Sequence, residues 1–174
     1  YTSLGFKNLS NNFINNDSEY TRSDHLVFGI EYNNTDSSRF SLEAFDKKYY
    51  NYPVSVNDMV SLANKGGDFE VLGNEDVSTS GRGKSYGIEF LYQQKLKNNF
   101  YGILSYTFFY SKFSGFDEVF LPSVWDNRNL ISFTGGYKLK KNWEISSKLR
   151  FTDKTPYAPI NNKLSLSLIH IWRC

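Results

Sequence analysis

The segment Trp143–Phe151 alternates large apolar side chains with charged and hydroxyl side chains, and this pattern constrains the fold more than any other feature. One side of the extended segment carries Trp143, Ile145, Leu149 and Phe151, and the other carries Glu144, Ser146, Lys148 and Arg150. Because successive side chains of a strand point to opposite faces, the segment is predicted to be a two-faced β-strand. A charged face opposite an aromatic face suits a wall between lipid and a wet interior, as in a transmembrane β-barrel.

The same unit recurs along the chain. Further alternating segments cover residues 25–32, 39–47, 84–96, 100–111 and 130–138. Short polar turns at 33–38, 97–99 and 140–142 alternate along the chain with long connections at 51–83 and 112–128. Bacterial barrels place short turns on the periplasmic side and long loops outside. The long connections, and the stretch after Thr152, are therefore expected at the cell exterior.

Composition narrows the class further. The 174 residues suit one domain, and the net charge of +2 comes from scattered basic residues, so no nucleic-acid partner is predicted. Aromatic residues make up 18% of the chain, yet no run approaches the roughly 20 apolar residues of a spanning helix. The one cysteine, Cys174, provides neither a disulfide framework nor a thiolate metal cluster.

Two other architectures also alternate. A soluble β-sandwich binding module presents its polar face to water, although its strands are usually shorter, at about five or six residues. A small, complete eight-stranded outer-membrane barrel with a structural or binding role would need two more strands, within residues 1–24 and 160–174.

A set of short stretches carries a family likeness. They are Asp24–Tyr32, Arg39–Phe45, Gly81–Phe90, Ser105–Thr107, Trp125–Leu130, Thr134–Tyr137 and Trp143–Ile145. In this order and spacing, over about residues 22–159, they resemble the C-terminal β-barrel of TonB-dependent outer-membrane receptors of the Bacteroidetes type.

The resemblance implies an all-β, antiparallel transmembrane barrel of 22 strands in the outer membrane of a Gram-negative bacterium, plugged by an N-terminal domain. Such a receptor imports a scarce ligand (an iron chelate, cobalamin or a glycan) with energy delivered by TonB. Its partners would be outer-membrane lipid, TonB through the plug region, and the ligand. No enzymatic activity is implied.

Residues 1–165 would then supply about six strands of the larger barrel. The chain begins at Tyr1 without a signal peptide, and neither a plug nor a TonB box is present, so it is interpreted as an internal fragment. Six strands cannot close a barrel, since bacterial single-chain barrels start at eight. We therefore expect the chain not to fold stably alone.

The last nine residues, Leu166–Cys174, form a separate case. The codons CTGTCTCTTATACACATC encode Leu166–Ile171, and that string resembles the transposon end used in DNA-library preparation. We hypothesise that this tail is adaptor-derived and non-native, the alternative being a genuine edge strand. Sequencing the source DNA decides between the two.

Candidate functional residues fall into two sets. Aromatics of the second long connection that could stack on a sugar or a chelate ring are Phe113, Phe116, Phe120 and Trp125. Charged residues expected to line the lumen, where they pair or are hydrated, are Glu89, Glu144, Lys148 and Arg150. Asp126 and Arg128 are expected to form a salt-linked corner. No catalytic residue, metal ligand or cofactor is predicted, because no nucleophile–base set and no ligand cluster stands out.

Overall fold

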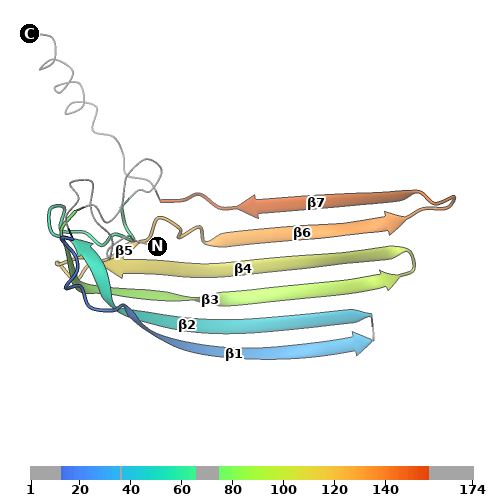
Figure 1. The fold of residues 1–174 in the computed structure, drawn as a ribbon. Helices are drawn as coiled ribbons and strands as arrows, with labels where there is room; N and C mark the ends of the chain where they lie inside the picture. Colours follow the sequence, from blue (N-terminus) through green and yellow to red (C-terminus); the bar gives the residue numbers. More distant parts are fainter. Residues whose placement is uncertain (1–12, 36, 66–74, 157–174) are drawn as a thin grey trace, which may run out of the picture.

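The computed structural model describes residues 13–35, 37–65 and 75–156, which form a single antiparallel sheet (Figure 1). Its strands are β1 (Arg22–Thr35), β2 (Ser38–Ser55), β3 (Val77–Lys97), β4 (Phe100–Ser114), β5 (Phe120–Pro122), β6 (Asn129–Lys138) and β7 (Glu144–Thr152). The order across the sheet is β1-β2-β3-β4-β6-β7, and the short β5 pairs with β4 beside this path. The suspected tail, Leu166–Cys174, lies outside the described residues.

All six predicted strands are present, and the prediction of an all-β, antiparallel sheet is confirmed. The strands are nevertheless longer than the alternation indicated. β2 continues to Ser55, β3 begins at Val77 and β4 continues to Ser114, so both long connections are shorter than expected. β5, within the second connection, was not predicted.

The glycines before residue 84 explain part of this error. Glycines are typical of loops, but Gly83 is a strand residue that lies under the ring of Phe113. A Cβ at Gly83 would come within 2.3 Å of that ring. The glycine therefore serves a close side-chain approach rather than a turn.

The short turns gather at one end of the sheet and the long connections at the other (Figure 1). Asn98 and Asn99 join β3 to β4 with φ values of 50° and 67°. Positive φ at both central residues is typical of the type I′ turn, which matches the twist of hairpin strands, and asparagine tolerates it well. Local sequence thus determines the position of this hairpin.

The strand register collects most of the large apolar side chains of the six main strands on one face, here termed the apolar face. One row across the sheet joins Ile30, Leu42, Phe90, Tyr106, Ile131 and Phe151. The next row joins Tyr32, Phe40, Tyr92, Leu104, Phe133 and Leu149. The faces predicted for Trp143–Phe151 agree with the register, and Phe45 lies on the opposite, polar face. In the described chain the apolar face is uncovered, with Phe28 73% and Ile145 63% exposed.

The apolar band is staggered from strand to strand. It runs from Leu26 to Tyr32 on β1, and from Trp143, which directly precedes β7, to Phe151 on β7. At the long-connection end the band stops at Leu26 on β1 but at Phe151 on β7, and the row of Phe151 meets β1 four residues further along, at Ile30 (30 − 26). At the short-turn end the band stops at Tyr32 on β1, whose row meets β7 at Leu149, but it continues from Leu149 for six more residues, to Trp143 (149 − 143). At about 3.4 Å per residue and five strand spacings of about 4.8 Å, the strands are tilted by roughly 30–40° relative to the band.

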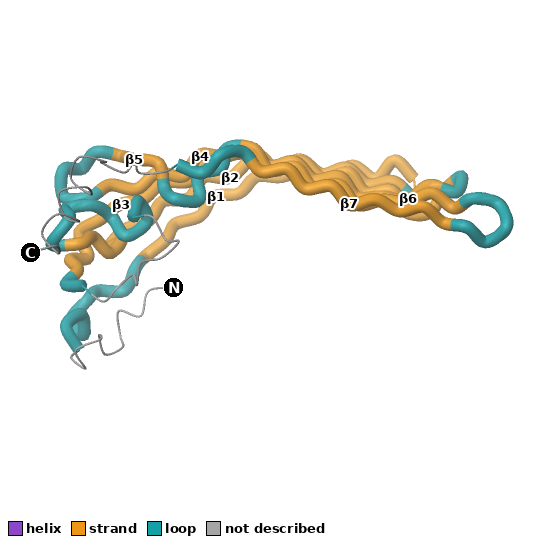
Figure 2. Tube along the Cα trace, turned by 90° about the horizontal axis from the view of Figure 1, so that it is seen from above, coloured by secondary structure: helices purple, strands orange, loops and turns teal. Residues whose placement is uncertain are grey.

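Along most of its length the molecule is one sheet thick, and a second layer appears only at the long-connection end (Figure 2). No helix among the described residues is long and apolar enough to cross a membrane. The packed part of the chain, and with it the candidate site, lies at the long-connection end.

Candidate functional site

The long-connection end contains a small buried core. The buried apolar side chains of the described residues are Val54, Leu62, Ala63, Val77 and Phe113. Residues 56–63 fold back on the end of β2, where Ser55 N donates to Val60 O (2.9 Å) and Leu62 N to Pro53 O (3.0 Å). This return covers the strand ends and forms the second layer seen in Figure 2.

The two long connections are bonded to each other. The amide of Val124 donates to the carbonyl of Ala63 (2.9 Å), and the Asn64 side chain donates to the carbonyls of Leu121 and Pro122, at 2.9 Å each. The two connections therefore form one platform rather than independent loops, because the backbone of each supplies partners for the other.

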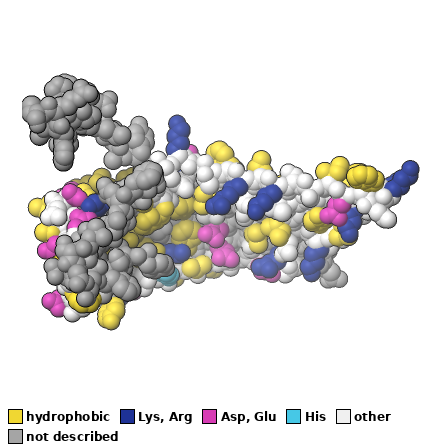
Figure 3. Space-filling model, turned by 45° about the horizontal axis from the view of Figure 1, so that its top comes forward, with side chains coloured by type: hydrophobic (Ala, Val, Ile, Leu, Met, Phe, Trp, Pro, Cys, Tyr) yellow, Lys and Arg dark blue, Asp and Glu magenta, His cyan; other side chains and the backbone are white. Residues whose placement is uncertain are grey.

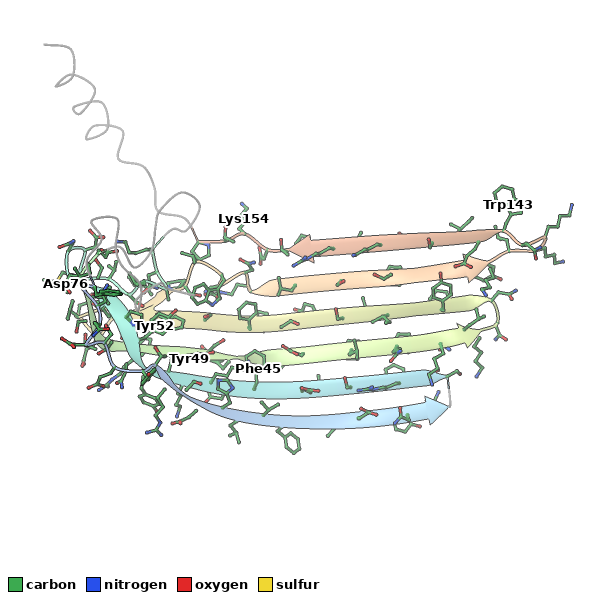
Figure 4. All side chains as sticks on the ribbon, in the orientation of Figure 1. Phe45, Tyr49, Tyr52, Asp76, Trp143 and Lys154 are labelled. Carbon is green, nitrogen blue, oxygen red and sulfur yellow. The ribbon has the colours of Figure 1, made fainter. Side chains whose placement is uncertain are left out.

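Phe113 is the centre of an aromatic cluster on the polar face. Its ring centroid lies 4.4 Å from that of Tyr52, 5.5 Å from that of Tyr49 and 5.7 Å from that of Trp125. Tyr49 and Tyr52 come from the bend of β2 (Figure 4). Burial raises the pKa of the Tyr52 hydroxyl, with a smaller contribution from Tyr49.

Asp126 and Arg128 form the predicted salt-linked corner, which precedes β6. The Asp126 side chain is fully buried, with Arg128 Nε at 3.2 Å and the amide of Ser111 donating to Oδ1 at 3.3 Å. The guanidinium of Arg128 lies 4.0 Å from the ring centroid of Tyr110. The buried carboxylate thus fixes the chain where it turns back into the sheet, so a structural role is supported.

A second charged cluster was not predicted. Lys65 Nζ lies 2.5 Å from Asp58 and 2.6 Å from Glu75, and the hydroxyl of Ser55 donates to the Glu75 carboxylate. Desolvation lowers the pKa of Lys65, but its hydrogen bonds and charge interactions with Asp58 and Glu75 outweigh this and raise it above its ordinary value. Sequence reasoning missed this cluster because its members are 7 to 17 residues apart (65 − 58 and 75 − 58) in a segment without periodicity.

The four candidate aromatics do not form one surface. Phe113 is only 2% exposed, which leaves its ring no surface for a ligand, whereas Phe116 and Trp125 are 42% and 43% exposed. Trp125 packs on Phe113 and donates from Nε1 to Ser111 Oγ (3.0 Å). The ring of Phe120 instead lies near Lys84, which belongs to the apolar face, with 4.4 Å between the ring centroid and the Lys84 Nζ.

The four charged candidates share the polar face by register. Glu89 lies opposite Glu43, and Arg150 and Lys148 lie opposite Ser132 and Thr134. Among the described residues, none of these three candidates forms an ion pair, while Glu144 accepts a hydrogen bond from the Tyr101 hydroxyl. On the face shown in Figure 3, charged side chains are spread among apolar and uncharged ones.

An open cavity of about 430 Å³ lies beside the corner at the long-connection end. Its lining comes from Pro122, Asp126, Arg128, Asp153, Lys154, Thr155 and Pro156. Such a mixed charged lining can hydrogen-bond a polar ligand. The described residues contain no group of three or more His, Cys, Asp or Glu side chains that could hold a metal ion.

Comparisons with known proteins bear on the fold. No protein-family model matches the chain, and no curated protein matches it. Among solved structures, it matches a chain of the FpvAI–pyocin S2 complex with a TM-score of 0.63 and 17% sequence identity. The match covers 94% of this chain but 21% of that chain, so the present sheet spans about a fifth of its neighbour. At this identity the likeness establishes the fold alone.

Proposed function

We propose that this sheet is part of the wall of an outer-membrane β-barrel, in a TonB-dependent receptor of the Bacteroidetes type that the sequence resembles. The receptor would bind a scarce ligand, such as an iron chelate, cobalamin or a glycan, and import it with energy passed through TonB and an N-terminal plug. The structural neighbour is a TonB-dependent receptor in complex with a pyocin, which supports a receptor over an enzyme. Ligand import by this receptor is part of the proposal.

The staggered apolar band is the observation that carries the proposal. Its strands are tilted relative to the band by roughly 30–40°, close to the 35–45° of membrane barrels. A face this apolar, spread over six strands and uncovered in the described chain, needs an apolar environment. Hydrocarbon satisfies that need.

A soluble sandwich would cover the same face with a second sheet. The described residues form one sheet, and no second sheet among them covers the apolar face. The long β2 and β3 argue in the same direction. β3 has 21 residues, against the 9–11 that cross a bilayer, so its outer half would project beyond the membrane.

Recognition is proposed at this projecting end. Phe116 and Trp125 are the exposed aromatics there, and the cavity beside Asp126 and Arg128 supplies polar groups. The buried ring of Phe113 would pack against the ring of Trp125 and hold it in place rather than touch the ligand. Glu89, Glu144, Lys148 and Arg150 would face the lumen, on the side away from lipid.

Spin labels at Ile88, Phe133 and Ile145 in the full-length protein test the membrane assignment. Each has a matched control one residue away on the polar face, at Glu89, Ser132 and Ser146. In reconstituted membranes the first set should be relaxed by oxygen and shielded from a water-soluble nickel reagent. The control set should show less oxygen contact. Equal exposure of both sets to the water-soluble reagent would refute the barrel.

A further inference from the structure

Three lysines lie side by side on the apolar face, at the border of the band nearest the long connections. Lys48 of β2 is in register with Lys84 of β3, which is in register with Lys112 of β4. Opposite residues in an antiparallel pair are about 4.5–5.5 Å apart at Cα, so the row spans roughly 10 Å. Like charges directly opposite each other destabilise a sheet. An anion beside the row would remove this cost.

The protein itself supplies too little negative charge. Asp24 is opposite Lys48, but its carboxylate is already bound by Arg22 at 2.9 Å. Asp46 lies two residues inward on β2 and forms no ion pair with the row. Among the described residues, therefore, none of the three lysines has an ion-pair partner. The three lysine charges and the single negative charge of Asp46 add up to a local net charge of +2.

The ionic groups next to this border do not change that sum, since the carboxylate of Asp153 interacts with the cations Lys154 and Arg128. Arg128 reaches the apolar face over the ring of Tyr110, at 4.0 Å, and its charge is matched by the buried Asp126 at 3.2 Å. The row is thus the unbalanced charge at this border.

Aromatic rings mark the depth of the row. One step inward, Tyr86 and Tyr110 stack with ring centroids 5.3 Å apart. Tyrosine favours the level where the apolar interior of a membrane meets the head groups. Lys84 Nζ lies 4.4 Å from the Phe120 ring centroid, and Lys112 Nζ 5.9 Å from that of Tyr110. Their stems thus follow apolar surface while the ammonium groups stay at head-group depth.

We propose that Lys48, Lys84 and Lys112 bind the phosphate groups of lipid in the leaflet around the long-connection end. Lipid is the source that fits, because the row continues the apolar face and borders the proposed acyl region. Three cations within roughly 10 Å match a head group bearing more than one phosphate. The inference rests on the proposed membrane assignment and adds a specific lipid contact to it.

The test compares the full-length protein in detergent with its variant Lys48→Gln/Lys84→Gln/Lys112→Gln. Delipidated protein is titrated with the probe, lipid A carrying two phosphates. Native mass spectrometry counts the bound lipid molecules. Each lysine near an anionic lipid is worth about fivefold in affinity, so the triple variant should bind roughly a hundredfold more weakly. Heat-modifiable gel mobility verifies that the variant is folded.

The matched control removes three exposed lysines at the opposite end of the sheet, Lys97→Gln/Lys140→Gln/Lys141→Gln. It should bind the lipid like the unaltered protein. A triple-lysine effect below threefold, or an equal loss in the control, overturns the proposal, and so does displacement of the lipid by equimolar inorganic phosphate. Binding by the unaltered protein should also weaken steeply with salt, and salt-independent binding counts against the row even if the variant fails to fold.

The two proposals fail separately. If the spin labels report lipid and the lysine variant still binds lipid A normally, the membrane wall stands and the phosphate contact is wrong. If the labels report water, both fall together.

Discussion

Replacing Phe113 by alanine should loosen the long-connection end while leaving the rest of the sheet intact. The ring is 2% exposed and lies within 5.7 Å, centroid to centroid, of Tyr49, Tyr52 and Trp125. Truncating a buried phenylalanine costs about 3–5 kcal/mol. If the whole cost falls on local opening of this end, the open population rises roughly 150- to 5,000-fold.

Hydrogen exchange of the full-length protein in detergent measures that population. Useful reporters are the amides of Leu62 and Val124, which donate to Pro53 and Ala63 within the second layer. Exchange in peptides covering residues 53–65 and 120–128 should accelerate strongly. Exchange in residues 86–92, in the middle of β3, should not change, because these lie in the apolar band.

The matched control is Phe116→Ala, which removes the same ring from a side chain that is 42% exposed. It should change exchange in the same peptides far less, by a few-fold, since surface truncations usually alter stability by about 0.5 kcal/mol or less. Equal acceleration by the two variants, or none with Phe113→Ala, would refute the role of Phe113 as the centre of the cluster.

Three further substitutions probe other contacts in the full-length protein. Asp126→Ala should lower the free energy of unfolding by about 1–3 kcal/mol, since the Ser111 amide and Arg128 lose their partner. Asp126→Asn should lower it less. Guanidinium unfolding in detergent measures both variants, and equal losses would argue against a contribution of these hydrogen bonds. Gly87→Ala should reduce the folded yield on heat-modifiable gels, because the added Cβ would lie 2.3 Å from the Phe108 carbonyl oxygen; an unchanged yield would mean that β3 and β4 separate easily. Lys65→Met should accelerate proteolysis within residues 53–65 several-fold, because Asp58 and Glu75 lose their shared cation. A cleavage rate equal to that of the unaltered protein would show that the ion pairs contribute nothing.

The sequence allowed the strands of the band to be predicted because one apolar and one polar face impose a period of two on each strand. Trp143–Phe151 is the clearest case, and its faces agree with the register. Beyond the band the long connections pack on the strand ends, so the period fades although the hydrogen-bond ladder continues. That is why the ends of β2 and β3 looked like loop.

The candidate site was harder to anticipate for a related reason. Phe113 and Phe116 are similar in sequence context, yet one is enclosed by tyrosines from β2 and the other is exposed. Contacts between segments 60 residues apart along the chain, such as Tyr52 with Phe113 (113 − 52 = 61), leave no local pattern. Asp126 and Arg128 could be anticipated because both members of that pair lie within three residues.

The up-and-down path of the chain also bears on how such a wall is assembled. Each main strand pairs with the one before it, so the ladder can close by adding one hairpin at a time, starting from turns such as Asn98–Asn99. The short turn within each hairpin makes the closure of that hairpin entropically cheap. Within the described chain β1 and β7 each keep one edge whose backbone groups have no strand beside them, and these edges are the points from which the wall would grow in either direction.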